Sequence, residues 1–522
     1  MRHLLLLLLI GLAVSVTSCR NDFDFESQTG SLSFSKDTVY LDTVFTDIGS
    51  STYTLKVYNN SDKNISIPSL RLKKGTASKY RLMVDGMAGQ VFEDVELLAK
   101  DSMYIFVSVT AEVADANPTD FLYTDQILFG EETNSNHQKV ELVTLIQDAY
   151  FIYPGRVQNP DESYTYDELN LGVDGDGNPI TIRGRFLEES NPVNGNELHW
   201  TNTKPYVIYG YAAVPSNKTL VVDAGARIHF HAESGLIVAN NASIHVNGTN
   251  STTAALENEV IFEGDRLESD FSEVPGQWGT IWLTQGSTNN QIKNLTIKNA
   301  TVGILVSGND GTPTPSLAIE NTQIYNCSNV GILARTGNIE GKNMVINNCG
   351  QASFAGSFGG SYEFTHCTFA NFWSNSTQTC IRLDDFITTE TGDEIEPLEK
   401  ANFNNCIIYG STNFGVFYRK KGTTFNYKFD HCLIKFADYS NQFGNNPMYS
   451  FTDTTLYDTC LIATNSIVNN PDFKDARKNE LIIGEDSAAR GTADNTYSTF
   501  NDILNNTRSG ATDMGAYNWL SF

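Results

Sequence analysis

A six-residue phrase recurs along the second half of this 522-residue chain. In each copy an apolar residue is followed by two polar residues, and a compact side chain then precedes x-Ile or x-Phe. The copies are Ile292–Ile297, Ile319–Ile324, Phe364–Phe369, Phe403–Ile408, Phe429–Ile434 and Tyr457–Ile462. A phrase repeated every few tens of residues is typical of stacked architectures, in which each repeat is stabilised by its neighbours.

The third residue of the phrase identifies the turn. It is Asn294, Asn321, His366, Asn405, His431 or Thr459. Asn and His are enriched where a residue other than glycine takes positive φ, so we expect a tight turn between two short strands in every copy. Copies stacked about 4.8 Å apart form a parallel sheet wound into a helix. The sequence therefore predicts an all-β chain whose body is a right-handed parallel β-helix.

The composition excludes one class of partner. Charged residues make up 18% of the chain, and the net charge is −26 with a pI near 4.6. The only run of three basic residues is Arg419-Lys420-Lys421. So acidic a protein repels phosphate backbones, and we expect no nucleic-acid partner.

The N-terminus predicts export and a lipid anchor. Arg2 and His3 precede an apolar run, Leu4–Val14, that is too short for a membrane span of about 20 residues but is typical of a secretory signal. The small residues before Cys19 resemble a bacterial lipobox, and the acidic stretch after it resembles the export tags of Bacteroidetes lipoproteins. These resemblances imply a signal peptide at 1–18, lipidation of Cys19, a tether at 19–29, and attachment to the outer membrane facing outside the cell.

The rest of the chain divides into two folded parts and a connector. Residues 30–150 alternate apolar and polar side chains over 53–57, 104–109 and 140–146, which predicts a β-sandwich. The segment Tyr53–Ser61 resembles immunoglobulin-like modules related to the ASH domain. Residues 151–205 are rich in Gly, Asn and Pro and are expected to form a connector or cap.

Residues 206–517 form the predicted β-helix, followed by a tail at 518–522. Pro275–Ile281 resembles a segment of secreted bacterial β-helix proteins, and Arg508–Tyr517 resembles the closing motif of pectate-lyase-like chains. The resemblance implies the fold of that superfamily and carries no catalytic residue with it.

No catalytic set of the familiar β-helix enzymes is complete. Asn321-Thr322-Gln323 lacks the acid of an Asn-Thr-Asp motif, and no His-Gly follows Asp384-Asp385. On a continuing strand those two carboxylates point to opposite faces, so both cannot reach one glycosidic oxygen. We therefore assign no catalytic residue, metal or cofactor.

The same region offers a candidate binding site. Trp373 interrupts the apolar pattern as a loop residue would, and its ring suits stacking on a sugar, although the aromatics Phe369, Phe372 and Trp373 also suit core or turn positions. Arg382 and Asp384 share a strand face, with Arg335 or Lys342 as candidate neighbours. The acidic insertion 388–400 follows as a loop.

Seven cysteines remain after Cys19, an odd number that cannot pair completely within the chain. Six follow Asn, His or Thr at a predicted turn: Cys327, Cys349, Cys367, Cys406, Cys432 and Cys460, while Cys380 stands apart. We expect one buried column of mostly reduced thiols, with disulfides as the alternative. The absence of a Cys-x-x-Cys pair argues against zinc.

Five sites match the Asp-Ser/Thr-apolar acceptor pattern that resembles Bacteroidetes O-glycosylation sites. The acceptors are Thr38, Thr43, Ser102, Thr454 and Ser487, with Thr38 or Thr43 favoured because both lie near the tether.

The sequence is compatible with three functions. The first is a non-catalytic module that binds a polysaccharide or belongs to an outer-membrane protein complex. The second is a polysaccharide lyase or glycoside hydrolase with an unrecognised site on the flank of the β-helix. The third is a structural spacer or adhesin.

Overall fold

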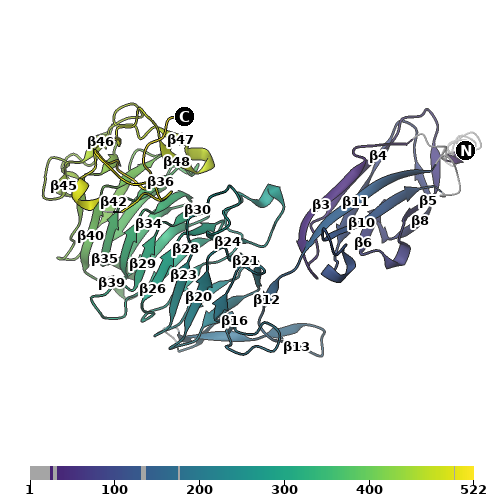
Figure 1. Ribbon diagram of the computed structural model, residues 1–522, viewed down its shortest axis with the longest axis horizontal. Helices are drawn as coiled ribbons and strands as arrows, with labels where there is room; N and C mark the ends of the chain where they lie inside the picture. The colour runs from purple at the N-terminus through teal and green to yellow at the C-terminus, as the bar shows by residue number, and fades with distance from the viewer. Residues whose placement is uncertain (1–23, 28–31, 131–136, 174–176, 499) are drawn as a thin grey trace, which may run out of the picture. The chain divides into compact units, whose positions relative to one another are not determined.

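The computed structural model describes residues 24–27, 32–130, 137–173, 177–498 and 500–522 (Figure 1). Cys19 lies outside these residues. The chain forms two compact units, Met1–Asp148 and Ala149–Phe522. The described residues are organised in strands with short 3-10 turns, and they contain no helix long and apolar enough to cross a membrane. The prediction of an all-β chain is confirmed. The 3-10 turns are η1 (Gly75–Ala77), η2 (Val113–Asp115), η3 (Ser269–Phe271), η4 (Pro447–Tyr449), η5 (Ala476–Lys478) and η6 (Asn495–Tyr497).

The first unit holds two sheets around one core. The larger sheet runs β1-β5-β10-β11-β3, with β8 paired to β5, and the smaller runs β2-β4-β9-β6-β7. Apolar residues alternate along the strands and meet between the sheets, as Val57, Ile67, Ile105 and Val140 do. An immunoglobulin-like topology stays a prediction. The strands are β1 (Glu26–Ser27), β2 (Leu32–Phe34), β3 (Thr38–Phe45), β4 (Tyr53–Asn59), β5 (Ile65–Leu72), β6 (Tyr80–Val84), β7 (Met87–Gly89), β8 (Val91–Leu97), β9 (Ser102–Val109), β10 (Leu122–Phe129) and β11 (Gln138–Gln147).

The second unit holds three long sheets, which we call the first, second and third sheet. The first contains β12 (Tyr150–Ile152), β18 (Tyr206–Ile208), β21 (Arg227–Phe230), β24 (Val260–Gly264), β27 (Leu295–Lys298), β30 (Gln323–Cys327), β33 (Val345–Cys349), β36 (Thr368–Asn371), β41 (Ile407–Gly410), β44 (Leu433–Lys435) and β46 (Leu461–Ala463). The second contains β15 (Glu168–Val173), β16 (Pro179–Phe186), β19 (Tyr211–Val214), β22 (Gly235–Val238), β25 (Ile281–Leu283), β28 (Val302–Ser307), β31 (Val330–Arg335), β34 (Ala352–Phe358), β37 (Thr379–Asp384) and β42 (Val416–Arg419). The third contains β17 (His199–Trp200), β20 (Thr219–Asp223), β23 (Ser243–Asn247), β26 (Asn290–Lys293), β29 (Leu317–Glu320), β32 (Asn338–Lys342), β35 (Gly360–Thr365), β40 (Leu398–Asn404), β43 (Lys428–Asp430) and β45 (Tyr457–Asp458).

The chain visits the three sheets in a fixed order. From β18 to β37 each successive strand joins the next sheet, and every third strand pairs in parallel with its predecessor in the same sheet. Inward side chains stack in register, for example Ile304, Ile332, Phe354 and Ile381 along the second sheet, and all are fully buried. Long parallel sheets are thus present, as a β-helix requires. The right-handed winding stays a prediction.

The turn entering the first sheet has the predicted backbone. Asn294, Asn321, His366, Asn405, His431 and Thr459 all adopt φ between 46° and 52°. Asn343 occupies the same column with φ 48°, although its segment does not match the six-residue phrase. The prediction of a left-handed turn in every copy is confirmed, and the reason is steric, because Asn tolerates this conformation better than most residues.

The cysteines form two columns, so the expectation of one column is wrong. Cys367 and Cys406 lie at the turn entering the first sheet, and each donates its backbone N–H to the next Sγ along, at 3.4 Å. Cys327 and Cys349 instead lie at the end of their strands and face each other in register. Each turn of the chain has one corner before a strand of the first sheet and another after it, and at both corners a cysteine can follow Asn. The dipeptide is therefore the same at two different places in the fold. Burial raises the pKa of Cys406 well above its ordinary value, so this thiol stays protonated.

Residues 464–522 run back over the outside of the first sheet. The last strand of that sheet, β46, ends at Ala463, and a hairpin of β47 (Phe473–Asp475) and β48 (Glu480–Ile483) follows. Leu481, Ile503 and Tyr517 pack on the outward faces of Tyr325 and Val345. We call residues 464–522 the C-terminal segment. It extends the core to the outer surface of one sheet.

The residues resembling a closing motif hold this segment in place. The Arg508 guanidinium is buried and donates to Asn343 Oδ1 at 3.1 Å and to the carbonyl groups of Gly515 at 2.9 Å and Ala516 at 3.1 Å. Asp513 accepts the N–H groups of Gly491 and Trp519. The motif is therefore a polar clamp on the turn entering the first sheet.

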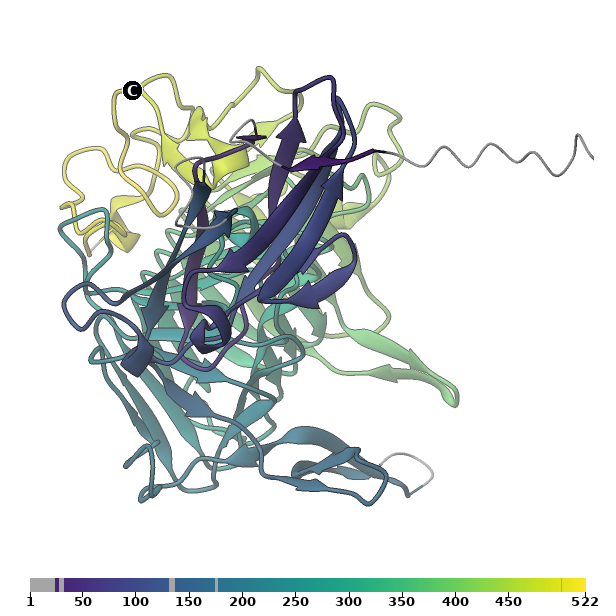
Figure 2. The ribbon, with the colours of Figure 1, turned by 90° about the vertical axis from the view of Figure 1, so that its right-hand side faces the viewer.

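Residues 151–205, expected as a connector, contribute strands to the starting edge of all three sheets. They also form the hairpin of β13 (Arg156–Gln158) and β14 (Tyr164–Tyr166). The acidic insertion is a second hairpin, of β38 (Phe386–Thr389) and β39 (Gly392–Ile395), which projects from the second unit in green in Figure 2.

Candidate functional site

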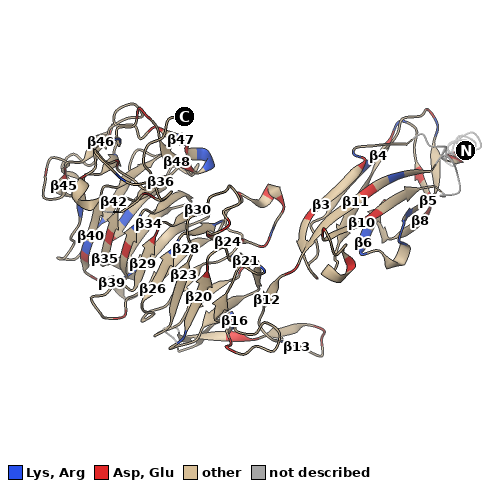
Figure 3. Ribbon diagram, viewed as in Figure 1, with Lys and Arg blue, Asp and Glu red and all other residues tan. Residues whose placement is uncertain are grey.

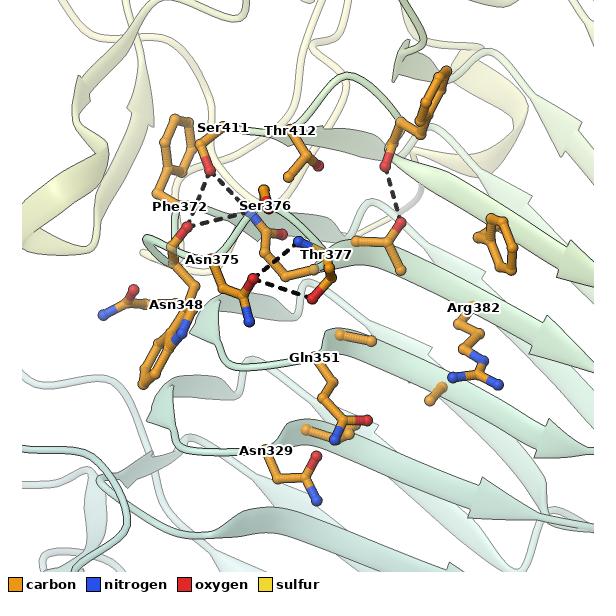
Figure 4. A pocket seen from close by; sticks show the side chains of 18 of the residues that line it. Asn329, Asn348, Gln351, Phe372, Asn375, Ser376, Thr377, Arg382, Ser411 and Thr412 are labelled. Carbon is orange, nitrogen blue, oxygen red and sulfur yellow. Dashed lines mark hydrogen bonds between the residues drawn. The ribbon is translucent and has the colours of Figure 1, made fainter. Parts of the chain in front are cut away.

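A groove of about 2020 Å³ lies on the outer side of the second sheet. Its lining comes mainly from strands β31, β34, β37 and β42, the loops 372–378 and 411–414, and residues 473–477 of the C-terminal segment. The hairpin of β38 and β39 adds residues 386–388 at one end. We call this cavity the groove. Segments far apart in the sequence build it, and Figure 4 shows it from close by.

The floor of the groove is apolar. Val330 faces Ala352 on the neighbouring strand, and Leu333 faces Ala355, because parallel strands in register place like positions side by side. Val330, Ala352 and Ala355 form a small buried cluster outside the main core. The partly buried Leu333 packs against this cluster, and the short alanine side chains leave room in the groove for the apolar face of a planar ligand.

Amide side chains border one edge of this floor. Asn329, Gln351 and Gln378 each stand directly before a strand of the second sheet, so they recur once per turn of the chain. Figure 4 shows Asn329 and Gln351 at the starts of neighbouring strands, with Arg382 across the floor from them. Amides both donate and accept hydrogen bonds, which is the chemistry that hydroxyl groups require.

Unsatisfied polar atoms are concentrated at the groove. Among the described residues, eight buried side-chain nitrogen or oxygen atoms have no hydrogen-bond partner, and four of them belong to the groove lining: Asn329 Oδ1, Gln378 Oε1, Asp384 Oδ1 and Thr412 Oγ1. Buried atoms of this kind are tolerated where a ligand or ordered water completes their bonding. The groove therefore has the polar chemistry of a binding site.

Arg382, Asp384 and Arg419 form a charged cluster at the other edge. Arg382 Nε and Nη2 lie 2.8 Å and 2.7 Å from Asp384 Oδ2, and Arg419 Nη1 lies 3.6 Å from the same oxygen. Burial raises the pKa of Asp384 above its ordinary value, while hydrogen bonding and charge from Arg382 act in the opposite direction. The predicted shared face of Arg382 and Asp384 is confirmed.

Asp385 does not contribute to the groove lining. It is fully buried, and its carboxylate accepts the backbone N–H groups of Lys421 and Gly422, each at 2.8 Å. This agrees with the expectation that the side chains of Asp384 and Asp385 point in different directions. Asp385 holds a turn, and Asp384 stands at the groove.

Trp373 lines the groove together with Arg382 and Asp384, so the structure brings the three predicted binding residues to one cavity. Its loop is fixed by its own carbonyl group, which accepts from Gln378 Nε2 at 3.3 Å and Ser411 Oγ at 3.2 Å. Phe369, by contrast, is a core residue, and Phe372 is half-buried against Phe473.

Several lining residues were not predicted from the sequence: the amides Asn329, Gln351 and Gln378, and Lys474 and Arg477 of the C-terminal segment. Of the two alternative neighbours of Arg382, Arg335 lines the groove, whereas Lys342 lies on the third sheet and pairs with Glu340 at 2.8 Å. Lys474 and Arg477 arrive from the C-terminal segment. Aligning the repeats on their strand starts would have revealed the amide column, but no local signal places residues 473–477 here.

The hairpin β38–β39 is attached beside the groove by charge. Lys421 Nζ bonds to Asp393 Oδ2, and the ring of Phe386 lies under Arg419 at 4.4 Å and under Lys421 Nζ at 4.1 Å. The acidic insertion thus begins at the groove.

The predicted glycan acceptors differ in exposure. Thr454 is exposed, whereas Thr38, Thr43 and Ser102 are half-buried in or beside strands of the first unit. Ser487 is buried, and its Oγ accepts the N–H of Ala489. Thr454 is therefore the most exposed of the five residues.

One group of described side chains has metal-ligand spacing. Atoms of Asp430, His431 and Asp494 lie within 4.8 Å of one another. Asp430 is already paired with Lys428 Nζ at 3.0 Å and with His431 Nδ1 at 2.7 Å. The lysine supplies the positive charge there, and we assign no metal to this cluster.

No family model matches the chain, and no curated protein matches it. Three of the solved structures to which the chain is similar are the following. The ASH/PapD-like domain 7 of human CEP192 is 8% identical, with 25% of this chain and 97% of that chain covered and a TM-score of 0.16. The catalytic unit of a GH87 α-1,3-glucanase from Streptomyces thermodiastaticus is 10% identical, with 73% and 75% covered and a TM-score of 0.31. A family 123 glycoside hydrolase from Clostridium perfringens is 4% identical, with 42% and 70% covered and a TM-score of 0.15. Scores this low carry no argument about function.

Proposed function

We propose that this protein is a lipid-anchored protein of the outer membrane that binds a polysaccharide in the groove without transforming it. The observation that carries the proposal is the groove itself, with its apolar floor between an amide edge and an arginine edge. Sugar rings present one apolar side and a rim of hydroxyl groups, so they match such a surface. In this proposal the first unit is an immunoglobulin-like sandwich and the second a right-handed parallel β-helix.

Retention on polysaccharide tests the proposal. Purified residues 20–522 are passed over immobilised pectin, glycosaminoglycan and mannan, and Trp373→Ala is compared with the parent protein. We expect retention on at least one polymer and a dissociation constant about tenfold weaker in the variant, equivalent to about 1.4 kcal/mol. The reason is that the variant removes an aromatic surface from the groove lining.

Trp282→Ala is the matched control. Trp282 is half-buried on β25 of the same sheet, outside the groove lining, and its Nε1 donates to Ser307 Oγ at 2.9 Å. Equal losses in the two variants, or no retention of the parent protein on any polymer, would contradict the proposal.

Catalysis is the second candidate, favoured by Asp384. A desolvated carboxyl group with a raised pKa is a feature of general acids, and an arginine stands beside it. The same polymers are therefore assayed for new reducing or unsaturated ends. Their release by the parent protein, abolished in Asp384→Asn, would replace the binding function with an enzymatic one.

The anchor is tested by intact mass. Native protein from its own host is expected to begin at Cys19 and to carry a diacylglycerol-type increment, because the lipobox-like residues precede that cysteine. Cys19→Ala is expected to leave the membrane fraction. The same spectrum tests O-glycosylation. A protein without acyl or hexose-type increments would refute both modifications.

A further inference from the structure

We infer that the groove selects acidic polysaccharides, and that Arg382 and Arg419 bind the carboxylate or sulfate groups of the ligand directly, without a divalent cation. This inference rests on the proposed polysaccharide binding and adds the class of ligand.

The charge of the groove is opposite to that of the chain. Five basic residues line it, namely Arg335, Arg382, Arg419, Lys474 and Arg477, against two acidic residues, Asp384 and Asp475. The excess of three positive charges stands out in a chain with a net charge of −26. Figure 3 shows a blue turn beside β47 and β48, the place of η5, whose basic residues are Arg477 and Lys478. A local positive field attracts anionic ligands and gives neutral ligands no comparable attraction, so it favours binding of the anionic ones.

The second cavity of the same unit makes the contrast sharper. Its lining contains Glu340, Glu363, Glu396 and Glu399 and only one basic residue, Lys400, and it lies beside the third sheet. The two cavities therefore differ in the sign of their charge. Positive charge is gathered where the apolar floor and the amide edge are.

The arginine cluster has capacity left for a ligand. One carboxylate, Asp384, faces two guanidinium groups, so the cluster keeps one positive charge. Arg382 directs Nε and Nη2 to the aspartate, and none of the described residues accepts a hydrogen bond from its Nη1. Arg419 lies over the ring of Phe386, with its guanidinium carbon 4.4 Å from the ring centroid, and remains 37% exposed at its side chain. Held guanidinium groups bind carboxylate and sulfate well because their donors are fixed in direction.

Asp384 is a positioning residue in this arrangement. Its Oδ2 receives both arginines, and its side chain is only 3% exposed. A ligand anion therefore meets the two arginines, while Asp384 Oδ1, which has no partner among the described residues, is left for a hydroxyl group or an ordered water.

The two carboxylates of the groove are poorly suited to calcium. Calcium requires about six to eight oxygen ligands. Asp384 Oδ2 is paired with arginine, while Asp475 accepts the N–H of Arg477 at 3.2 Å and pairs with Lys478 at 3.4 Å. The carboxylate or sulfate group of an anionic sugar is therefore expected to bind Arg382 and Arg419 directly.

The test compares three polymers on the whole residues 20–522 protein. Polygalacturonate carries carboxylates, dextran sulfate carries sulfate esters, and dextran is neutral; each is measured in EDTA and again with calcium. We expect retention on one or both acidic polymers in EDTA, little on dextran, and weakening with added salt. Which acidic polymer is retained identifies the anionic group.

Arg382→Gln and Arg419→Gln are each expected to weaken binding to the acidic polymer about tenfold or more. Lys400→Gln is the matched control, since Lys400 is exposed in the acidic cavity and pairs with Glu363 at 3.2 Å. Arg382→Lys keeps the charge but loses the forked donors, so it is expected to recover only part of the affinity. Thermal melts verify that each variant is folded, and Arg419→Gln serves if Arg382→Gln is not.

The outcomes separate the inference from the proposed function. Equal retention on dextran, unchanged binding in both Gln variants, or binding that disappears in EDTA and returns with calcium would overturn the inference and leave polysaccharide binding in place. No retention of the parent protein on any polymer, including those of the wider panel, would overturn both.

Discussion

Cys406→Asp is expected to unfold the C-terminal turns of the second unit. Cys406 is fully buried between Cys367 and Cys432 in the column at the turn entering the first sheet. A carboxylate placed there would lack water and a cationic partner, at a cost of several kcal/mol. Denaturant unfolding followed by intrinsic fluorescence measures the loss of stability.

Two milder replacements at Cys406 are the controls. Cys406→Ala leaves a small cavity and is expected to lower the free energy of unfolding by about 1 to 2 kcal/mol. Cys406→Thr is expected to be tolerated, because Thr322 is fully buried at the corresponding position of an earlier turn and donates to the Glu320 carbonyl at 2.9 Å. Collapse of the Ala variant, or a denatured chain with almost no titratable thiol, would mean that disulfides stabilise the second unit.

Arg508→Ala is expected to release the C-terminal segment from the first sheet. The variant leaves the Gly515 and Ala516 carbonyl groups and Asn343 without their buried donor. Burial lowers the pKa of Arg508 to about 10, so the guanidinium is charged at pH 7 and its hydrogen bonds are strong. We expect a loss of about 3 kcal/mol, seen as faster hydrogen exchange over residues 464–522.

The same variant is expected to weaken ligand binding, because residues 473–477 line the groove and lie on that segment. Arg490→Ala is the control within the segment. Arg490 stacks on Trp519 at 3.7 Å and donates to the Glu485 carbonyl, but it is not a buried clamp. Unchanged exchange in Arg508→Ala, or equal effects of both variants, would show that the closing motif does not hold the segment.

Local patterns in the sequence were sufficient for the turns and for one strand face of the site. Asn or His before a compact residue specifies a left-handed turn through steric preference alone, and φ at Asn294 and His431 follows it. Alternation along a strand likewise places Arg382 and Asp384 on one face without knowledge of any neighbour. Trp373 was recognisable because it breaks the apolar pattern.

The repeated pattern alone predicted one cysteine column, but the structure contains two. Asn326-Cys327 and His366-Cys367 look alike in the sequence, yet one pair ends a strand of the first sheet and the other precedes one. Each turn of the chain contains more than one corner, and a dipeptide does not say which corner it occupies. Only the register of the sheets distinguishes them.

The all-β character, the repeated left-handed turn and the shared face of Arg382 and Asp384 follow from local sequence, because each depends on residues within a few positions of one another. The tertiary structure decided the groove. Its floor requires β31, β34, β37 and β42 to lie in register, and one wall requires the C-terminal segment to return to strands more than a hundred residues earlier, as the bond from Arg508 to Asn343 shows. Such contacts depend on the packing of the whole unit, and no local preference encodes them.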